Sequence, residues 1–466
     1  MSVTFERELP DRWRWVEALR RAPARTALAG GGLAALLAFA FSASVSTVPP
    51  AEVPANVTAE SPAAPVERVT MKLSAQAAAE QQRPLARTAD LLAVQEAQPK
   101  TPEGRLLRVY TLMAQAQGRQ ALEEARRLTE DVPTFGLAQL VYADLLSALT
   151  LATPGFATYP PSLRDAPVER LDDLLAEGRA RVTAAGSRPP AGTLPSQFVF
   201  LAPSVHYAIA VDVSKSRLYL FENTAAGPVL KRDYYASVGK LGTSKRIEGD
   251  LRTPLGVYFI TGSVAPRKLA ERYGAGALPL NYPNQLDQLR GRTGSGIWLH
   301  GVEPTLFTRA PLATDGCVAL SNPDLRELSP LVNRQSTPVV IAESLQWVAA
   351  SQAPPPDFMH RFEAWREARQ AQATDLQQKF YSQTVHTPAA ASAVFGIEML
   401  HPERDRAGAA AVSVNNLSVL AWHDEDDVMI VTYTEAAQRE AQGHMKRQYW
   451  LRQSGDWSII FEGTIG

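Results

Sequence analysis

The chain has 466 residues, of which 45% are hydrophobic, and its formal net charge is −1 at pH 7. A chain of this length exceeds one ordinary core, so we expect about two to four domains. The balanced charge gives no field that would collect nucleic acid, and the sequence contains no zinc-ligand cluster or phosphate-binding glycine loop. We therefore exclude nucleic-acid binding, nucleotide hydrolysis and structural metal sites, and we expect no cofactor.

The N-terminal segment has the pattern of a membrane anchor. Residues 1–25 contain several arginines, whereas residues 26–48 contain no charge. At about 1.5 Å per helical residue the uncharged run spans roughly 34 Å, enough for the core of a bilayer. The positive-inside rule makes residues 1–25 a cytoplasmic leader and places everything after Pro49 outside the cytoplasm. A cleaved signal peptide is the alternative, because Ser42-Ala43-Ser44 supplies small residues.

The next two regions differ in periodicity. Residues 49–83 are rich in Ala, Pro, Val and Glu without a helical or strand period, which predicts a flexible linker. Residues 84–195 are predicted to be helical, and the spacing of Gly118, Ala121 and Leu128 is similar to a tetratricopeptide-type hairpin. An ordinary helical packing or dimerisation domain is an equal alternative, so a homodimer is one candidate assembly.

Strand patterns dominate residues 205–343. The apolar run 207–213, the polar turn after it and the return at 218–221 predict a β-hairpin. Further strand signals follow, among them the apolar run 338–342. We therefore expect a mainly β domain in this range.

Residues 355–466 begin with a helical pattern. Phe358, Phe362 and Trp365 share one face, which predicts a long amphipathic helix to about Tyr381. Strand patterns continue to the C-terminus, so a helix laid on an antiparallel sheet is expected. The whole chain is accordingly predicted to be a multidomain α+β protein.

Cys317 is the single cysteine of the chain. It cannot form an internal disulfide, so its value lies in reactivity or in packing. Most free cysteines behave as small buried hydrophobes. The polar approach through Thr314 and Asp315 and the flanking Gly316 argue for a nucleophile, so on these residues alone both interpretations stay open.

His300 is the candidate base for this thiol. It ends an apolar strand signal and precedes Gly301, which suits a side chain that projects at a strand end. The imidazole would take the thiol proton while the sulfur attacks a carbonyl to form a thioester. Backbone N–H groups around Gly316 and Cys317 could hold the oxyanion, and Thr314 could orient the loop or the substrate.

Four spaced segments together resemble the catalytic domain of L,D-transpeptidases, the YkuD family. They are residues 238–240, residues 249–258, Leu299-His300-Gly301 and Thr314-Asp315-Gly316-Cys317-Val318. The resemblance implies that Cys317 attacks the carbonyl of the L-centred diaminopimelate residue in a peptidoglycan tetrapeptide stem, with His300 as the base. It also implies that Thr314, Gly301 and Gly316 match the remaining motif positions.

Two positions depart from the family's pattern. Asp315 stands where many members carry histidine, and Ala319 stands where arginine is common. The missing arginine weakens the inference that the donor stem is held as in cross-linking members. The carboxylate of Asp315 could oppose thiolate formation or could orient His300.

The order of regions resembles the cell-shape-determining L,D-carboxypeptidases, in which a helical region precedes the YkuD domain and a nuclear transport factor 2-like domain follows it. The leading prediction is a peptidoglycan-modifying L,D-transpeptidase that binds stem peptides. The alternatives are an L,D-carboxypeptidase that trims tetrapeptides to tripeptides, an amidase that releases wall-anchored lipoprotein, and an inactive wall-binding scaffold. The anchor would make the protein a single-pass protein of the bacterial inner membrane with its catalytic domain in the periplasm.

Overall fold

The computed structural model describes residues 98–150, 168–350, 354–382, 412–437 and 443–465. The chain divides into two compact units. Of the described residues, the first unit contains 98–128, 141–150 and 185–187, and the second contains the rest. The predicted leader, anchor and linker, residues 1–83, lie outside the described residues.

The predicted localisation, a single-pass inner-membrane protein with a periplasmic catalytic domain, is not supported and is corrected. In the part of the chain that the structure describes, no helix is both long and apolar enough to cross a bilayer. Helix α9 (Val168–Ala185) has 18 residues, but charged side chains such as Asp172 and Arg181 interrupt its apolar positions. The described part of the chain supports neither the membrane anchor, whose predicted residues lie outside it, nor the homodimer.

The N-terminal region is helical. Its described helices besides α9 are α5 (Pro102–Ala114), α6 (Gly118–Asp131) and α7 (Gly136–Thr150). Thr101 caps α5, because its side chain accepts a hydrogen bond from the Gly104 amide and so satisfies one free donor of the first turn. Helix α6 buries the apolar stripe that contains Ala121 and Leu128, as its periodicity predicted.

The second unit is built around a five-stranded sheet with the order β5-β4-β3-β12-β7. Its strands are β3 (Tyr207–Asp212), β4 (Arg217–Thr224), β5 (Gly227–Tyr235), β7 (Gly256–Phe259) and β12 (Pro338–Ala342). Strands β3 and β12 are parallel, and their other neighbours are antiparallel. This sheet confirms the predicted hairpin and the mainly β character of the range.

Smaller sheets carry the motif residues. A three-stranded sheet has the order β11-β9-β8, and a parallel pair joins β10 to β6. Their bounds are β6 (Val238–Gly239), β8 (Ala277–Pro279), β9 (Trp298–His300), β10 (Leu312–Thr314) and β11 (Val318–Ala319). A further pair joins β1 (Thr193–Pro195) to β13 (Trp347–Ala349), and α10 (Gln285–Leu289) and α11 (Asn322–Leu328) lie in the connections.

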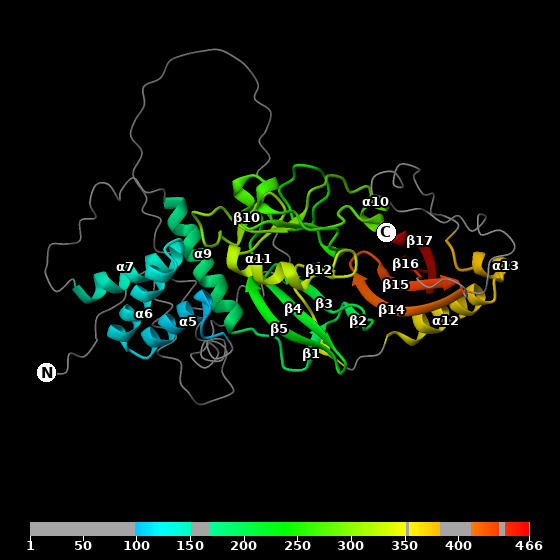
Figure 1. Cartoon of the computed structure of the whole chain (residues 1–466), viewed down its shortest axis with the longest axis horizontal. Coiled ribbons are helices and arrows are strands. Elements are labelled where there is room, and N and C mark those ends of the chain that lie inside the picture. The colour runs from blue at the N-terminus through cyan, green and yellow to red at the C-terminus, as the bar shows by residue number, and fades with distance from the viewer. Residues whose placement is uncertain (1–97, 151–167, 351–353, 383–411, 438–442, 466) are drawn as a thin grey trace, which may run out of the picture. The chain divides into compact units, whose positions relative to one another are not determined.

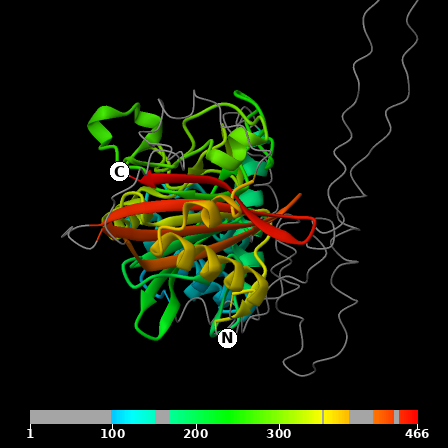
Figure 2. The ribbon, with the colours of Figure 1, turned by 90° about the vertical axis from the view of Figure 1, so that its right-hand side faces the viewer.

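The C-terminal region is a helix on a sheet, and Figures 1 and 2 show α12 lying across the strands. The sheet has the order β17-β16-β15-β14-β2. Its strands are β2 (Phe198–Phe200), β14 (Val412–His423), β15 (Asp427–Ala437), β16 (His444–Gln453) and β17 (Asp456–Ile465). The predicted long helix is wrong: α12 (Pro356–Gln370) ends because Gln372 adopts a φ of 57°, and α13 (Thr374–Gln378) follows separately.

The two faces of this sheet bury different partners. Val419 and Ala421 point towards α12, where Trp365 packs in a common apolar cluster. Leu420 and Trp422 point to the opposite face and share a core with the five-stranded sheet, because side chains alternate along a strand. The two sheets therefore bury one continuous apolar layer.

Candidate active site

Strands β9 and β11 bring the two candidate catalytic residues to neighbouring positions. They run parallel, with Val318 opposite Leu299 and Ala319 opposite His300. Val318 and Leu299 are completely buried in the core of the domain. Because side chains alternate along strands, Cys317 and His300, which flank these two residues, turn away from that core. The sequence alone could not show this register.

The thiol of Cys317 is held as a neutral group. It is half-buried, and its Sγ donates to the carbonyl of Gly296 at 3.3 Å. Burial raises the pKa of the thiol above its ordinary value, and the carboxylate of Asp315 adds to this effect. A backbone hydrogen bond from Trp298 and the charge of Arg309 act in the opposite direction. The thiol consequently needs a base to become a nucleophile at neutral pH.

His300 has the tautomer and the charge state of a base. Only 3% of its surface is exposed, and this burial lowers its pKa from 6.5 to about 4. Its Nδ1 lies 2.5 Å from the carbonyl oxygen of Gly301, which can only accept a hydrogen bond. The neutral ring therefore carries its hydrogen on Nδ1, and Nε2 keeps a free lone pair. The ring of Tyr273 packs edge-on against it at 5.0 Å.

Thr314 closes the turn that carries the thiol. Its hydroxyl donates to the carbonyl of Cys317 at 2.7 Å and accepts from the amide of Gly316 at 3.1 Å. Gly316 has a φ of +122°, and a Cβ at this position would lie 2.7 Å from the Arg252 carbonyl oxygen. The sequence TDGC therefore needs both its threonine and its glycine for the shape of the turn.

Gly301 serves the site through its backbone. Its carbonyl orients His300, and a Cβ at this position would lie 2.2 Å from Asn322 Oδ1. Asn322 accepts from the amide of Ala275 and donates to the carbonyl of Val302, both at 2.7 Å. Glycine is thus required where the chain leaves β9 beneath this asparagine.

Asp315 is paired with a lysine. Its carboxylate pairs with Lys240 Nζ at 3.0 Å, and both side chains are more than half exposed. Nδ1 of His300 is occupied by the carbonyl of Gly301. Of the two roles considered for Asp315, opposition to thiolate formation fits this geometry.

Thr253 and Asn322 support the site, and the sequence motifs did not single them out for this role. Thr253 is completely buried, and its hydroxyl donates to the carbonyl of Gly316 and accepts from the amide of Gly239, each at 2.9 Å. It therefore ties β6 to the turn that holds the thiol. Its position beside Pro254 signals a rigid turn, but no local pattern reveals the distant partners.

Comparison with known proteins places this geometry in a family. Residues 206–341 match the L,D-transpeptidase catalytic domain, YkuD. No curated protein matches the chain in sequence.

Several solved structures are similar to parts of the chain. Bd1075 from Bdellovibrio bacteriovorus is 23% identical, with 58% of this chain and 98% of that chain covered and a TM-score of 0.45. The helical cell shape determining protein Pgp2 from Campylobacter jejuni is 18% identical, with 62% and 98% covered and a TM-score of 0.45. An L,D-transpeptidase from Mycobacterium smegmatis is 13% identical, with 29% and 58% covered and a TM-score of 0.20.

The matched range contains β9, β11 and the whole turn around Cys317. It also contains the buried histidine and the threonine that shapes the turn. Residues 206–341 are therefore an L,D-transpeptidase catalytic domain of the YkuD family.

Proposed function

We propose that this protein is a peptidoglycan-modifying L,D-transpeptidase that acts on tetrapeptide stems through a thioester on Cys317. The observation that carries the proposal is a YkuD catalytic domain whose buried histidine ends β9 and whose one thiol directly precedes the parallel neighbouring strand β11. A half-buried neutral thiol and a neutral imidazole with a free lone pair are the two groups that general-base activation requires.

The acylation step uses Nε2 of His300 as the proton acceptor. The thiol proton moves to Nε2 as Sγ of Cys317 bonds to the carbonyl carbon of the diaminopimelate residue. The imidazolium then protonates the nitrogen of the terminal D-Ala as the peptide bond breaks, and free D-Ala leaves. The stem remains attached to the enzyme as a thioester.

The second step returns the enzyme to its starting state. An amine of another stem attacks the thioester in transpeptidation, and His300 removes a proton from that amine. Sγ leaves as a thiolate and recovers its proton from the imidazolium. Water in place of the amine would give hydrolysis to a tripeptide, so the shape of the acceptor site decides between the two reactions.

The flanking regions extend this proposal. The C-terminal helix on a sheet, residues 355–466, is proposed to be a nuclear transport factor 2-like domain, which the packing of α12 on β14 and β15 supports. The helical region, residues 84–195, is proposed to be tetratricopeptide-like, supported by the buried stripe of α6. The catalytic domain, residues 205–343, lies between them in sequence.

The test is incubation of the full chain with purified disaccharide-tetrapeptide, with the products followed by mass spectrometry. The control is Cys317→Ala, which removes the sulfur and is expected to fold normally. Cross-linked dimer or exchange of the terminal D-amino acid would support the transpeptidase. Tripeptide alone would replace it with the carboxypeptidase. The absence of any cysteine-dependent product would reject both in favour of a lipoprotein amidase or a scaffold.

A further inference from the structure

The loop of residues 301–311 connects the two halves of the active site. It leaves β9 directly after His300 and enters β10, which ends at Thr314. Its last residues are held by the catalytic domain, because the Val238 amide donates to the Pro311 carbonyl at 2.8 Å and the Ser237 hydroxyl donates to the Ala310 carbonyl at 2.5 Å. The position of this loop therefore affects both ends of the site.

The middle of the loop is held from outside the matched domain. The amide of Phe307 donates to the carbonyl of Thr134 at 3.0 Å, and its ring lies 4.4 Å from the ring of Phe135. Residues 129–140 and the described part of 159–184 belong to the same compact unit as the catalytic domain. The first contact to the loop thus joins a segment before α7 to the residues after His300.

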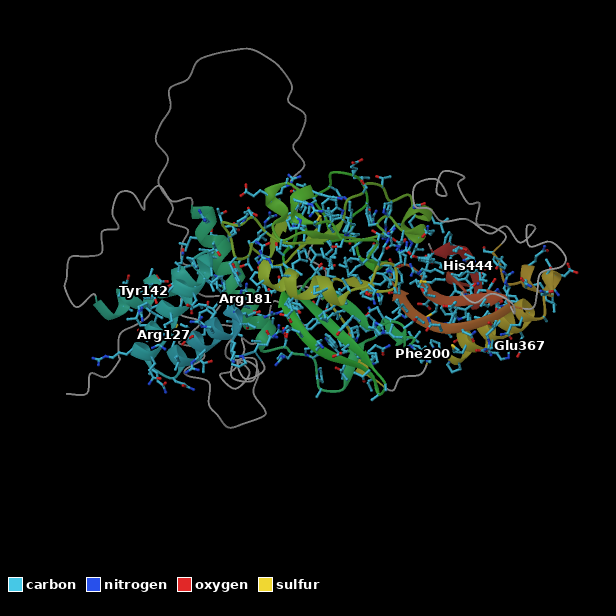
Figure 3. All side chains as sticks on the ribbon, in the orientation of Figure 1. Arg127, Tyr142, Arg181, Phe200, Glu367 and His444 are labelled. Carbon is cyan, nitrogen blue, oxygen red and sulfur yellow. The ribbon has the colours of Figure 1, made fainter. Side chains whose placement is uncertain are left out.

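A buried ion pair on α9 makes the second contact. Glu177 and Arg181 are joined at 2.7 Å, and their side chains are 3% and 1% exposed. The hydroxyl of Thr308 donates to Glu177 Oε1 at 2.7 Å and accepts from Arg181 Nη2 at 3.3 Å. Arg181, labelled on α9 in Figure 3, also lies 4.0 Å above the ring of Tyr235.

Such a pair is better suited to fixing one geometry than to adding stability. Removing two charges from water offsets most of their attraction, so a buried salt bridge contributes little net free energy of folding. Its hydrogen bonds, however, accept only one placement of the Thr308 hydroxyl. The pair therefore specifies where the loop lies.

Arg309, the residue after Thr308, is held by hydrogen bonds of its backbone and its side chain. The carbonyl of Arg309 accepts from the Tyr235 hydroxyl at 2.9 Å, and its guanidinium binds Glu303 at 2.7 Å and the Arg272 carbonyl at 3.0 Å. Burial has the larger effect on both catalytic groups, raising the pKa of Cys317 and lowering the pKa of His300, and the positive charge of Arg309 acts to lower both pKa values. Its placement consequently affects how easily the thiol ionises.

We propose that Glu177, Arg181 and Thr308 form a positioning element through which helix α9 sets the loop and the charge of Arg309 beside the active site. This inference rests on the catalytic roles proposed above for Cys317 and His300. It implies that the range matched by the family, residues 206–341, lacks residues that its own site requires.

The test is Thr308→Val in the full chain, which keeps the shape of the side chain and removes its hydroxyl. Thr111→Val is the matched control, because Thr111 is also buried and donates only to its own helix, at the Leu107 carbonyl. Iodoacetamide reports on Cys317 alone, since the chain has one cysteine. We expect Thr308→Val to slow alkylation at neutral pH about twofold and to move its pH profile upwards, because the arginine charge shifts away from the thiol.

The control variant and Thr308→Ser, which keeps the hydroxyl, are expected to follow the wild-type profile. Glu177→Gln provides a second test should Thr308→Val fail to fold, and it is expected to reproduce the slower alkylation. Profiles of Thr308→Val or Glu177→Gln that coincide with Thr111→Val would overturn the proposal. Alkylation needs no muropeptide, so this outcome is separate from any failure of the proposed transpeptidase activity.

Discussion

Thr253 donates a 2.9 Å hydrogen bond to the carbonyl of Gly316 across 63 positions of sequence. The same hydroxyl accepts from the amide of Gly239. One completely buried side chain therefore connects β6 with the turn that presents the thiol. This connection makes the shape of the turn depend on a residue far outside the TDGC motif.

We expect Thr253→Val to destabilise the protein and to disturb the site together. Valine leaves a buried amide and a buried carbonyl without their partner, which costs about 1–3 kcal/mol. Chemical denaturation measures the first effect, and the rate of Cys317 alkylation measures the second. Thr261→Val is the control, since its hydroxyl donates to the Pro279 carbonyl and not to the turn. Equal losses of stability and equal alkylation rates in the two variants would contradict the proposed connection.

His300→Gln is expected to slow acylation by about 10²-fold or more, because glutamine has no lone pair that can take the thiol proton at neutral pH. Binding of the stem should change little. Rapid-quench measurement of the acyl-enzyme with a tetrapeptide checks the rate. His206→Gln, at an exposed position, serves as the control. An unchanged acylation rate would remove His300 from the role of base.

The low pKa of His300 also predicts a pH-dependent stability. Its folded pKa is about 4 and its ordinary value is 6.5. As the pH falls below 6.5, the unfolded chain binds a proton that the folded chain refuses until about pH 4. The free energy of unfolding therefore falls by about 3 kcal/mol as the pH falls through this window. Above pH 6.5 the whole contribution of His300 to stability is present.

This linkage is checked by urea denaturation of the wild type and of His300→Gln at about pH 7.5 and about pH 4.5. We expect the wild type to lose more stability than the variant over this interval. Identical losses would show that the folded histidine keeps an ordinary pKa. The same low pKa predicts that acylation persists to about pH 5 and fails as the pH falls through about 4.

Asp315→Asn is expected to make Cys317 more reactive. The carboxylate raises the pKa of the thiol, so its removal should speed alkylation at neutral pH about two- to fivefold, a small factor because the side chain is exposed. The difference should shrink at about 1 M salt, where charges are screened. Asp375→Asn, in the C-terminal region, is the control for a general change in charge. Slower alkylation would instead assign Asp315 a supporting role.

Local structure could be predicted from the sequence because its causes act within a few residues. The apolar run 338–342 coincides with β12, and the glycine of TDGC occupies a conformation that favours glycine. The candidate pair, Cys317 and His300, came from chemical identity and motif spacing. The long helix to Tyr381 was wrong because a left-handed residue at 372 ends it, and no proline or glycine marks that position.

Pairings between distant segments could not be predicted. Phe198–Phe200 precedes the catalytic domain in sequence, yet it forms β2 at the edge of the C-terminal sheet. The contacts of Asn322 and Thr308 likewise join segments that share no periodic pattern. A pattern of alternation gives the buried face of a strand but not the identity of its neighbour.

The shared core leads to the last prediction, which concerns the C-terminal region. The sequence suggests a separable domain, but Leu420 and Phe461 of its sheet pack in one cluster with Phe221 and Val340 of the catalytic sheet. Removal of residues 355–466 would expose that face of the catalytic sheet to water. We expect the truncated chain to lose its native fold. Cys317 would then be alkylated faster than in the full chain, because the fold no longer protects it.

A point variant tests the same coupling without a truncation. Leu420→Ala removes apolar atoms from a residue that is 2% exposed and should cost about 2–5 kcal/mol. If the two sheets form one core, near-ultraviolet circular dichroism and Cys317 alkylation should report the same, earlier unfolding midpoint. Leu376→Ala, at an exposed position on α13, is the control. The opposite result is a circular dichroism signal that is lost at an earlier midpoint than the protection of Cys317. It would show that the catalytic sheet keeps its site while its apolar face is exposed, and so is stable without the C-terminal sheet.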